Sequence, residues 1–164
     1  SPRILAVVDR ITASIEQYIA VMAYVSLLAG VLVTIALWLF GVPYALFWGI
    51  LTFALNFIPY LGSLIATVLP VVLTLVDSQS LGMTLAVLIV LVVIQNGIGY
   101  LIQPRLAGNR LDLSPLVIIL SLAFWGTIWG IAGMILAVPL VVVIKTILQH
   151  IPQTKPIATL LSNQ

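Results

Sequence analysis

Apolar residues dominate this chain in long runs, and the runs differ in their period. Over residues 4–19, apolar side chains recur every three or four positions opposite charged and polar ones. This predicts an amphipathic helix at a membrane surface or against a partner segment. From about residue 20 to residue 40 the sequence is apolar all round, which predicts a membrane-crossing helix. Gly41-Val42-Pro43 then interrupts the pattern, and we expect Pro43 in the first turn of the next helix.

Residues 44–76 do not divide into whole membrane crossings. The stretch is too long for one crossing, and it is interrupted at residues 56–62. Pro59 removes a backbone donor there and Gly62 loosens the chain. Each remaining arm is shorter than the ~20 residues that cross a bilayer. The pattern predicts either a re-entrant helical hairpin or two tilted, incomplete spans.

The remainder of the chain repeats this plan. Residues 77–80 predict a capped turn, residues 81–102 predict a full-length span, and residues 103–112 predict a loop. A glycine-rich break at 126–133 divides residues 115–148 into two further arms. Each half therefore has a full span, a proline-initiated arm, a break containing glycine, and a second arm kinked by proline. This predicts an internal repeat.

Composition and charge extend this picture to a fold class. The chain is 63% hydrophobic and 6% charged, whereas soluble domains are about 45–50% apolar and about 25% charged. The charges leave three uncharged runs, 17–76, 78–104 and 113–144. Lipid requires a spanning backbone to satisfy its own hydrogen bonds. We therefore predict an all-α, polytopic integral membrane protein with two full spans and two Pro/Gly-broken helical hairpins. A soluble enzyme domain is excluded.

The basic residues predict how the chain is oriented. We place the N-terminus in the cytoplasm, and each hairpin returns to the face from which it starts. All six basic residues then lie on the cytoplasmic side, as the positive-inside rule favours. The two repeats start from opposite faces, so the repeat is inverted, an architecture typical of secondary transporters. The six residues are Arg3, Arg10, Arg105, Arg110, Lys145 and Lys155.

We expect one membrane domain over residues 1–164. Its parts are an interfacial helix at 1–19, a span with the first hairpin at 20–76, a span with the second hairpin at 81–150, and a cytoplasmic tail at 151–164. The sequence does not begin with methionine, so we expect it to be a piece of a longer protein.

The inventory of catalytic groups is nearly empty. The chain has no cysteine, a single histidine at position 150, and four scattered acidic residues. We therefore expect no catalytic residue, no metal site and no cofactor. The net charge of +2 forms no basic patch, so nucleic acid is not an expected partner.

Polar residues inside the spans are more informative, because lipid makes them costly unless they face a cavity or another helix. Asn56, Gln95 and Asn96 either line a solute path or hydrogen-bond between helices. Helix N-termini at the two breaks, near Ser63 and Ile131, could hold an anionic or polyhydroxyl ligand. The hydroxyls of Thr52, Ser63, Thr67, Ser121 and Thr127 fit bonds to their own helix backbone. The candidate substrate-binding residues are Asn56, Pro59, Gly62, Ser63, Gln95, Asn96, Gly130 and Gly133.

Four motifs in sequence order resemble the autoinducer-2 exporter family of bacterial permeases. They are Gly41-Val42-Pro43-Tyr44-Ala45-Leu46, Ile58-Pro59-Tyr60-Leu61-Gly62, Gln103-Pro104-Arg105 with Leu113-Ser114-Pro115-Leu116, and Trp129-Gly130-Ile131-Ala132-Gly133 with Ala137-Val138-Pro139-Leu140. The resemblance covers residues 10–148. It implies the C-terminal half of a multi-span inner-membrane transporter of autoinducer-2, with sodium/proton antiport proposed for some relatives. Many relatives carry an acid and an Asn where this chain has Ile98 and Tyr100, which weighs against cation coupling through that helix.

The function predicted is alternating-access transport of a small polar solute, which the resemblance identifies as autoinducer-2. One alternative is a sodium- or lithium/proton antiporter of the same family. Another is a membrane assembly module that transports nothing. The expected partners are the lipid bilayer, a small polar solute and the missing N-terminal half of the chain, and a homo-oligomer is compatible with the sequence.

Overall fold

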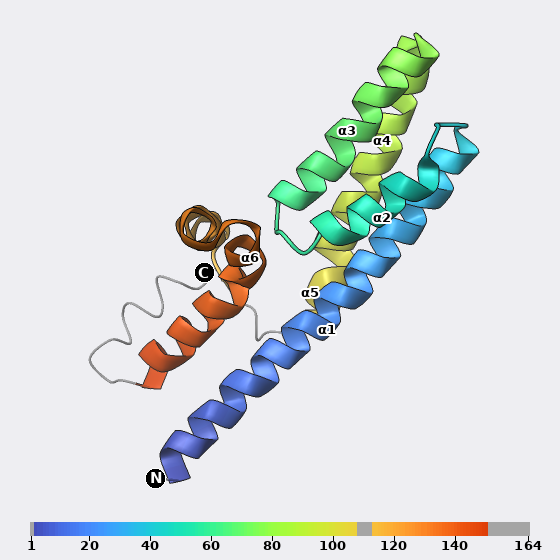
Figure 1. Ribbon diagram of the computed structural model, residues 1–164. Coiled ribbons are helices and arrows are strands. Elements are labelled where there is room, and N and C mark those ends of the chain that lie inside the picture. Colours follow the sequence, from blue (N-terminus) through green and yellow to red (C-terminus); the bar gives the residue numbers. More distant parts are fainter. Residues whose placement is uncertain (1, 108–112, 151–164) are drawn as a thin grey trace. The chain divides into compact units, whose positions relative to one another are not determined.

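The computed structural model describes residues 2–107 and 113–150, and these ranges are almost entirely helical (Figure 1). No strand occurs within them, so the predicted all-α fold class is confirmed. The predicted tail at 151–164 lies outside the described residues. The elements in chain order are α1 (Pro2–Leu39), α2 (Ala45–Leu55), α3 (Leu61–Ser78), α4 (Leu81–Gly97), the π-helix η1 (Ile98–Ile102), α5 (Gln103–Ala107) and α6 (Pro115–His150).

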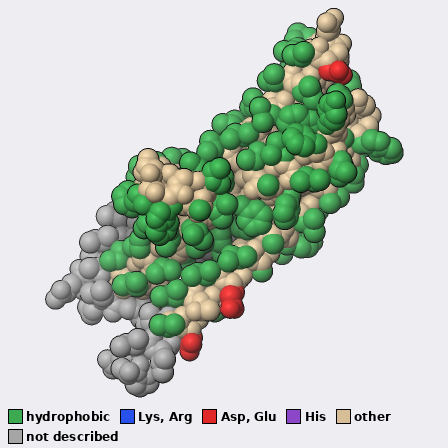
Figure 2. Space-filling model, in the orientation of Figure 1, with side chains coloured by type: hydrophobic (Ala, Val, Ile, Leu, Met, Phe, Trp, Pro, Cys, Tyr) green, Lys and Arg blue, Asp and Glu red, His purple; other side chains and the backbone are tan. Residues whose placement is uncertain are grey.

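Four helical segments are long and apolar enough to cross a membrane. They are Ile11–Leu39, Leu61–Ser78, Leu81–Leu106 and Pro115–Leu148, whereas α2 is shorter. Hydrophobic side chains cover most of the face drawn in Figure 2, and the acidic side chains in view are few. Such a surface is stable in lipid and not in water. The protein is therefore a multi-pass membrane protein.

The chain forms two compact units, one of residues 21–106 and one of residues 1–20 with 107–164. Helix α1 runs without interruption through residues of both units, so the predicted interfacial helix and first span form one continuous helix. The division of residues 1–164 into the parts predicted above stays a prediction.

Helix α1 ends in a Schellman motif. Gly41 adopts a left-handed φ of 69°, and its N–H donates to the Trp38 carbonyl at 3.0 Å. The N–H of Val42 donates to the Leu37 carbonyl at 2.9 Å, and both of these side chains are buried in one apolar cluster. The paired bonds and the apolar contact are the standard features of this cap. The predicted interruption at residues 41–43 is confirmed.

Pro43 does not lie in the first turn of the next helix, so that prediction is wrong. Helix α2 begins at Ala45, and Tyr44 precedes it with a left-handed φ of 60°. The tight turn set by Gly41 and the fixed φ of Pro43 hold the residues before Ala45 in non-helical conformations, so the helix begins only after them. The first bond of α2 therefore runs from the Trp48 N–H to the Tyr44 carbonyl, at 3.1 Å.

The predicted break at residues 56–62 is confirmed, and it separates α2 of 11 residues from α3 of 18 residues. The second arm is longer than expected, because α3 continues through Asp77 and Ser78. The expectation that both arms fall short of a crossing is therefore wrong for α3. Gly62 allows the hairpin to close, since a Cβ there would overlap the Leu55 carbonyl oxygen.

The capped turn before α4 is confirmed. Gln79 ends α3 with a left-handed φ of 48°, and the Ser80 hydroxyl accepts a hydrogen bond from the Met83 N–H at 3.3 Å. This is the usual N-cap arrangement. The helix that follows runs from Leu81 through the π-helix η1 to Ala107, so the loop predicted at 103–112 is wrong for residues 103–107.

Helix α6 contains the second predicted break, and the structure places it at Gly130, with φ of 62° and ψ of −140°. The two arms fold against each other, because the Ser121 hydroxyl donates to the Ala137 carbonyl at 3.2 Å. A Cβ on Gly133 would overlap the Trp125 carbonyl oxygen. The second hairpin therefore closes by the same glycine–carbonyl contact as the first.

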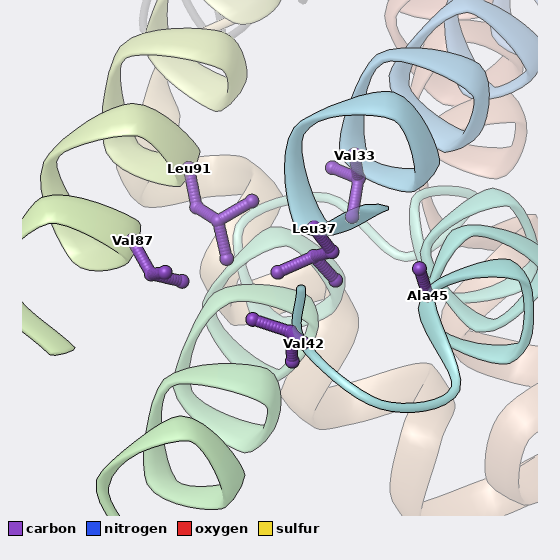
Figure 3. Close-up of a cluster of buried hydrophobic side chains, with 6 residues drawn as sticks. All are labelled: Val33, Leu37, Val42, Ala45, Val87 and Leu91. Atoms are coloured by element: carbon purple, nitrogen blue, oxygen red, sulfur yellow. The ribbon is translucent and has the colours of Figure 1, made fainter. Parts of the chain in front are cut away.

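The core of residues 21–106 joins α1, α2 and α4. Figure 3 shows the six apolar side chains of this cluster, which come from these helices and from the turn between α1 and α2. Trp48, Ile94 and three other partly buried hydrophobic residues pack against the cluster. Leu37 and Val33 are fully buried, and Leu91 is 1% exposed. This packing fixes the helices that carry the candidate site. The six residues are Val33, Leu37, Val42, Ala45, Val87 and Leu91.

Candidate solute-binding site

The tip of the first hairpin is attached to α1 by a hydrogen bond. The Asn56 amide donates to the Ser26 hydroxyl at 3.2 Å, and Ser26 is fully buried. Ser26 lies near the middle of the apolar segment Ile11–Leu39. The hairpin tip therefore meets α1 halfway along this apolar segment.

Helix α2 lies directly on the backbone of α1. A Cβ on Gly30 would come within 2.7 Å of the Gly49 carbonyl oxygen, and a Cβ on Gly49 would overlap the Thr34 hydroxyl. The Thr34 hydroxyl itself donates to the Gly30 carbonyl at 2.8 Å. Small residues at such a crossing allow two membrane helices to approach closely. The first arm of the hairpin is thus fixed to α1 along its length.

The loop between α2 and α3 holds the other first-tip candidates. Pro59 is half-buried, and Tyr60 has a positive φ of 60°, which is a strained conformation for a residue with a side chain.

The N-terminus of α3 does not offer the free donors that the sequence suggested. The N–H groups of Leu61, Gly62 and Leu64 donate to carbonyls of the preceding loop at 2.6, 2.9 and 3.1 Å. The Ser63 hydroxyl donates to the Tyr60 carbonyl at 3.0 Å. An anion at this helix end would have to compete with bonds already formed.

The two adjacent amides on α4 differ in their surroundings. Asn96 is exposed, and its amide donates to the Val92 carbonyl of its own helix at 2.8 Å. Gln95 is half-buried, and its Nε2 atom is buried with no hydrogen-bond partner among the described residues. The structure therefore does not bring Asn56, Gln95 and Asn96 together as one lining. Of the three, Gln95 is the one whose amide nitrogen makes no hydrogen bond among the described residues.

The π-helix η1 begins three residues after Gln95. Its defining bond runs from the Gln103 N–H to the Ile98 carbonyl, and Pro104 follows. A proline ring clashes with the carbonyl four residues earlier, here that of Tyr100, and a wider turn relieves that clash. π-Helical turns are frequent at functional sites. Here the π-turn lies between Gln95 and α5, the end of the helix that carries Arg105.

Contacts with α1 give the depth of Gln95. The Gln103 amide donates to the Met22 sulfur at 3.5 Å, and Val33 and Leu91 share one cluster, so α1 and α4 run antiparallel. Gln95 lies one turn beyond Leu91, which puts it level with Gly30 on α1. The Trp48 indole, next to Gly49, lies at nearly the same depth because Gly49 contacts Gly30.

Trp48 carries the second unpaired donor in this unit. Its Nε1 atom is buried with no hydrogen-bond partner among the described residues. Trp48 packs on the same apolar cluster as Ile94, the neighbour of Gln95. A buried donor without a partner costs about 1–3 kcal/mol. Two such donors at one depth therefore lower the stability of a unit in which most other polar side chains are hydrogen-bonded.

The second hairpin tip belongs to the other unit. Gly130 is exposed, whereas Gly133 is buried against Trp125. The Thr127 hydroxyl donates to the Phe124 carbonyl at 2.7 Å. Thr52 and Thr67 likewise donate to their own helices, at 2.8 Å each, as predicted, whereas Ser121 instead bonds across the hairpin.

Charged groups are scarce around both tips. Asp77 lies in the last turn of α3 and Arg105 lies in α5. In the part of the chain that the structure describes, no three His, Cys, Asp or Glu residues gather as metal ligands would. The first tip is therefore a neutral, amide- and hydroxyl-bearing region that suits an uncharged polar solute better than an ion.

Comparison with known proteins decides the family. The chain matches the AI-2E family transporter over residues 1–153. It belongs to the AI-2E transporter family. It is 36% identical over 159 residues to the AI-2 transport protein TqsA of Escherichia coli K12, which covers 97% of this chain and 46% of TqsA.

Two further relatives are named as candidate transport proteins. One, of Borreliella burgdorferi, is 36% identical over 98% of this chain and 45% of its own length. The other, of Haemophilus influenzae, is 38% identical over 95% of this chain and 44% of its own length. The chain thus spans less than half the length of these relatives, and it is a segment of the kind found in AI-2E family transporters.

Sequence reasoning missed several residues of this AI-2E segment. Ser26 was overlooked because a small hydroxyl in an apolar run gives little signal, and only its contact with Asn56 reveals its role. Trp48 reads as a packing residue, and its unpaired nitrogen depends on the fold. The π-helix had a local signal, since Gly97 and Pro104 lie close to its two ends and Gly99 lies within it, but glycine and proline also fit an ordinary kink.

Proposed function

We propose that residues 1–164 form the C-terminal part of an inner-membrane permease that exports a small polar solute, autoinducer-2, by alternating access. The observation that carries the proposal is the first hairpin, whose polar tip meets Ser26 halfway along the apolar segment Ile11–Leu39 of α1. A broken hairpin that ends at mid-depth is how many secondary transporters form a solute site. Similarity to TqsA supports autoinducer-2 as the solute.

The basic residues support the orientation within this proposal. The cytoplasm would hold Arg3, Arg10 and Arg105, together with the remaining Lys and Arg residues, in keeping with the positive-inside rule. The acidic residues of the described ranges, Asp9, Glu16 and Asp77, lie near the ends of apolar segments. None of them occupies mid-depth, where a coupling carboxylate would act.

Efflux measures the proposed activity. Bacteria that lack their own exporters and express the full-length protein should release autoinducer-2 faster than cells with an empty vector. Inverted vesicles provide the comparison with the antiporter alternative. Proton flux that depends on sodium or lithium, without autoinducer-2 movement, would contradict export and support antiport.

Cysteine accessibility separates transport from an assembly role. Residues 1–164 contain no cysteine, so single cysteines at positions 56–63 and 126–133 can be labelled without background from this segment. A transporter should show labelling by a small water-soluble thiol reagent at these tips, and autoinducer-2 should slow it. Tips that never react would favour the assembly module.

A further inference from the structure

Gln95 and Trp48 lack hydrogen-bond partners in a unit where most other polar side chains have one. The hydroxyls of Thr34, Thr52, Thr67, Thr74 and Thr84 all donate to carbonyls of their own helices. Gln95 Nε2 and Trp48 Nε1 are buried with no partner among the described residues. A buried donor without a partner lowers the stability of the folded protein. A ligand that binds only part of the time would supply the missing acceptor.

The two donors come from different elements at one depth. Trp48 belongs to α2, the arm of the hairpin fixed to α1 through Gly30 and Gly49. Gln95 belongs to α4, level with Gly30, three residues before the π-helix. Both residues border the apolar cluster of Val33, Leu37, Val42, Ala45, Val87 and Leu91, since Trp48 and Ile94 pack on it.

The chemistry of the two groups limits what they can bind. An indole N–H only donates, and the Gln95 nitrogen donates as well, so the ligand must present acceptor oxygens. No Asp, Glu, Lys or Arg lies between Glu16 and Asp77 or between Asp77 and Arg105. A charged ligand would therefore lack a counter-charge from these helices at this depth.

We propose that the Gln95 amide and the Trp48 indole donate to hydroxyl or carbonyl oxygens of a small, uncharged, polyhydroxyl solute bound beside the apolar cluster that α1, α2 and α4 share. The proposal rests on the proposed transport function and assigns the solute its hydrogen-bond donors. Asn56 is then a structural residue that holds the tip, because its amide is already engaged by Ser26.

The test uses the full-length protein in membrane vesicles and in detergent, with autoinducer-2 as the probe. Gln95→Met keeps side-chain length without the donor, and Trp48→Phe removes the indole N–H. Each should raise the KM for autoinducer-2 about fivefold, as expected for one lost hydrogen bond. The melting temperature of Gln95→Met without solute should stay the same or rise, because this change removes an unpaired buried donor at nearly constant side-chain volume.

Two matched controls accompany these variants. Thr84→Val removes a hydroxyl on α4 that bonds its own helix, and Trp38→Phe removes an indole N–H that is exposed at the end of α1. Both should keep the wild-type KM. The wild-type melting temperature should rise with autoinducer-2, and the rise should be smaller in Gln95→Met and Trp48→Phe.

Three results would overturn the proposal, and they are distinguishable. If both variants transport autoinducer-2 with the wild-type KM, the proposed site is wrong and the export function is unaffected. A lower melting temperature of Gln95→Met without solute shows that the Gln95 donor has a structural partner. A wild-type protein that neither moves autoinducer-2 nor is stabilised by it contradicts the export function, and with it the solute assigned to this site.

Discussion

Gly62 and Gly133 occupy equivalent places in the two hairpins, directly after the tip. In each case the missing side chain lets the backbone press on a carbonyl oxygen of the preceding arm, that of Leu55 or of Trp125. A carbonyl within a helix cannot move aside as a flexible side chain can. These two positions therefore depend on glycine for space, whereas Gly130 depends on it for its positive φ.

Substituting Gly62 by alanine should destabilise the protein. The new Cβ would overlap the Leu55 carbonyl oxygen, and overpacking of this kind costs about 1–3 kcal/mol. Gly97→Ala is the matched control, because nothing lies within 4 Å of a Cβ there and alanine favours a helix by up to about 1 kcal/mol. Thermal unfolding of the full-length protein in detergent measures both. Equal stability of the two variants would contradict the close contact.

The Asn56–Ser26 hydrogen bond should give a measurable coupling. The single changes Asn56→Ala and Ser26→Ala and their combination form a double-mutant cycle. We expect a coupling free energy of about 0.5–1.5 kcal/mol in unfolding, as for one neutral hydrogen bond. Asn96→Ala should show no coupling with Ser26→Ala, because the Asn96 amide bonds its own helix. A coupling free energy near zero between Asn56→Ala and Ser26→Ala would contradict the hydrogen bond between the hairpin tip and α1.

At the scale of elements, the helix from Leu81 to Ala107 is regular except for the π-helix η1. Pro104 accounts for the irregularity, since it lacks an N–H and its ring crowds the Tyr100 carbonyl. Helices α3 and α6 also contain an internal proline, Pro70 and Pro139 respectively. Each of the longer helices after the first thus has a weak point, where movement between transport states would cost least.

Pro104→Ala should restore a regular turn and stabilise this helix. An interior proline costs about 3 kcal/mol relative to alanine, part of which the π-turn already relieves, so we expect a gain of about 1–2 kcal/mol in unfolding free energy. Pro115→Ala is the control, because Pro115 begins α6 and proline is well tolerated at that position. Denaturant titration of both variants is the measurement. A loss of stability in Pro104→Ala would show that the π-helix has another cause.

In the molecule as a whole, the segment Leu81–Leu106 is long and apolar enough to cross the membrane. Gln79 and Ser80 form the turn before it and Asp77 lies just ahead of that turn, whereas Arg105 lies at its other end. In the proposed orientation, which follows the positive-inside rule, Arg105 would lie in the cytoplasm.

Single cysteines on either side of this span should therefore label from opposite faces. In the full-length protein with its other cysteines replaced, Gln79→Cys should react with a membrane-impermeant thiol reagent added to intact cells. Leu106→Cys should react only after the cells are opened. The reverse pattern would invert the orientation, and labelling of both from outside would show that residues 81–106 do not span.

The fold class, the breaks at residues 56–62 and 126–133, and the family were all predicted from the amino-acid sequence. These depend on local properties: a long apolar run needs lipid, and proline or glycine interrupts a helix wherever the helix lies. Element boundaries were less certain. Asp77 and Ser78 continue α3 and residues 103–107 remain helical, because nothing in the sequence there forces a helix to end.

Only the tertiary structure decided which polar side chains are already satisfied. Asn56, Gln95 and Asn96 look alike in sequence, but Asn56 bonds Ser26 on another helix, Asn96 bonds its own helix, and the Gln95 nitrogen is buried and unpaired. Hydrogen-bond partners depend on the rotation and register of packed helices, which are set by contacts between residues far apart in the chain. For this reason the candidate donors, Gln95 and Trp48, are identified by the packing of α1, α2 and α4 and not by any motif.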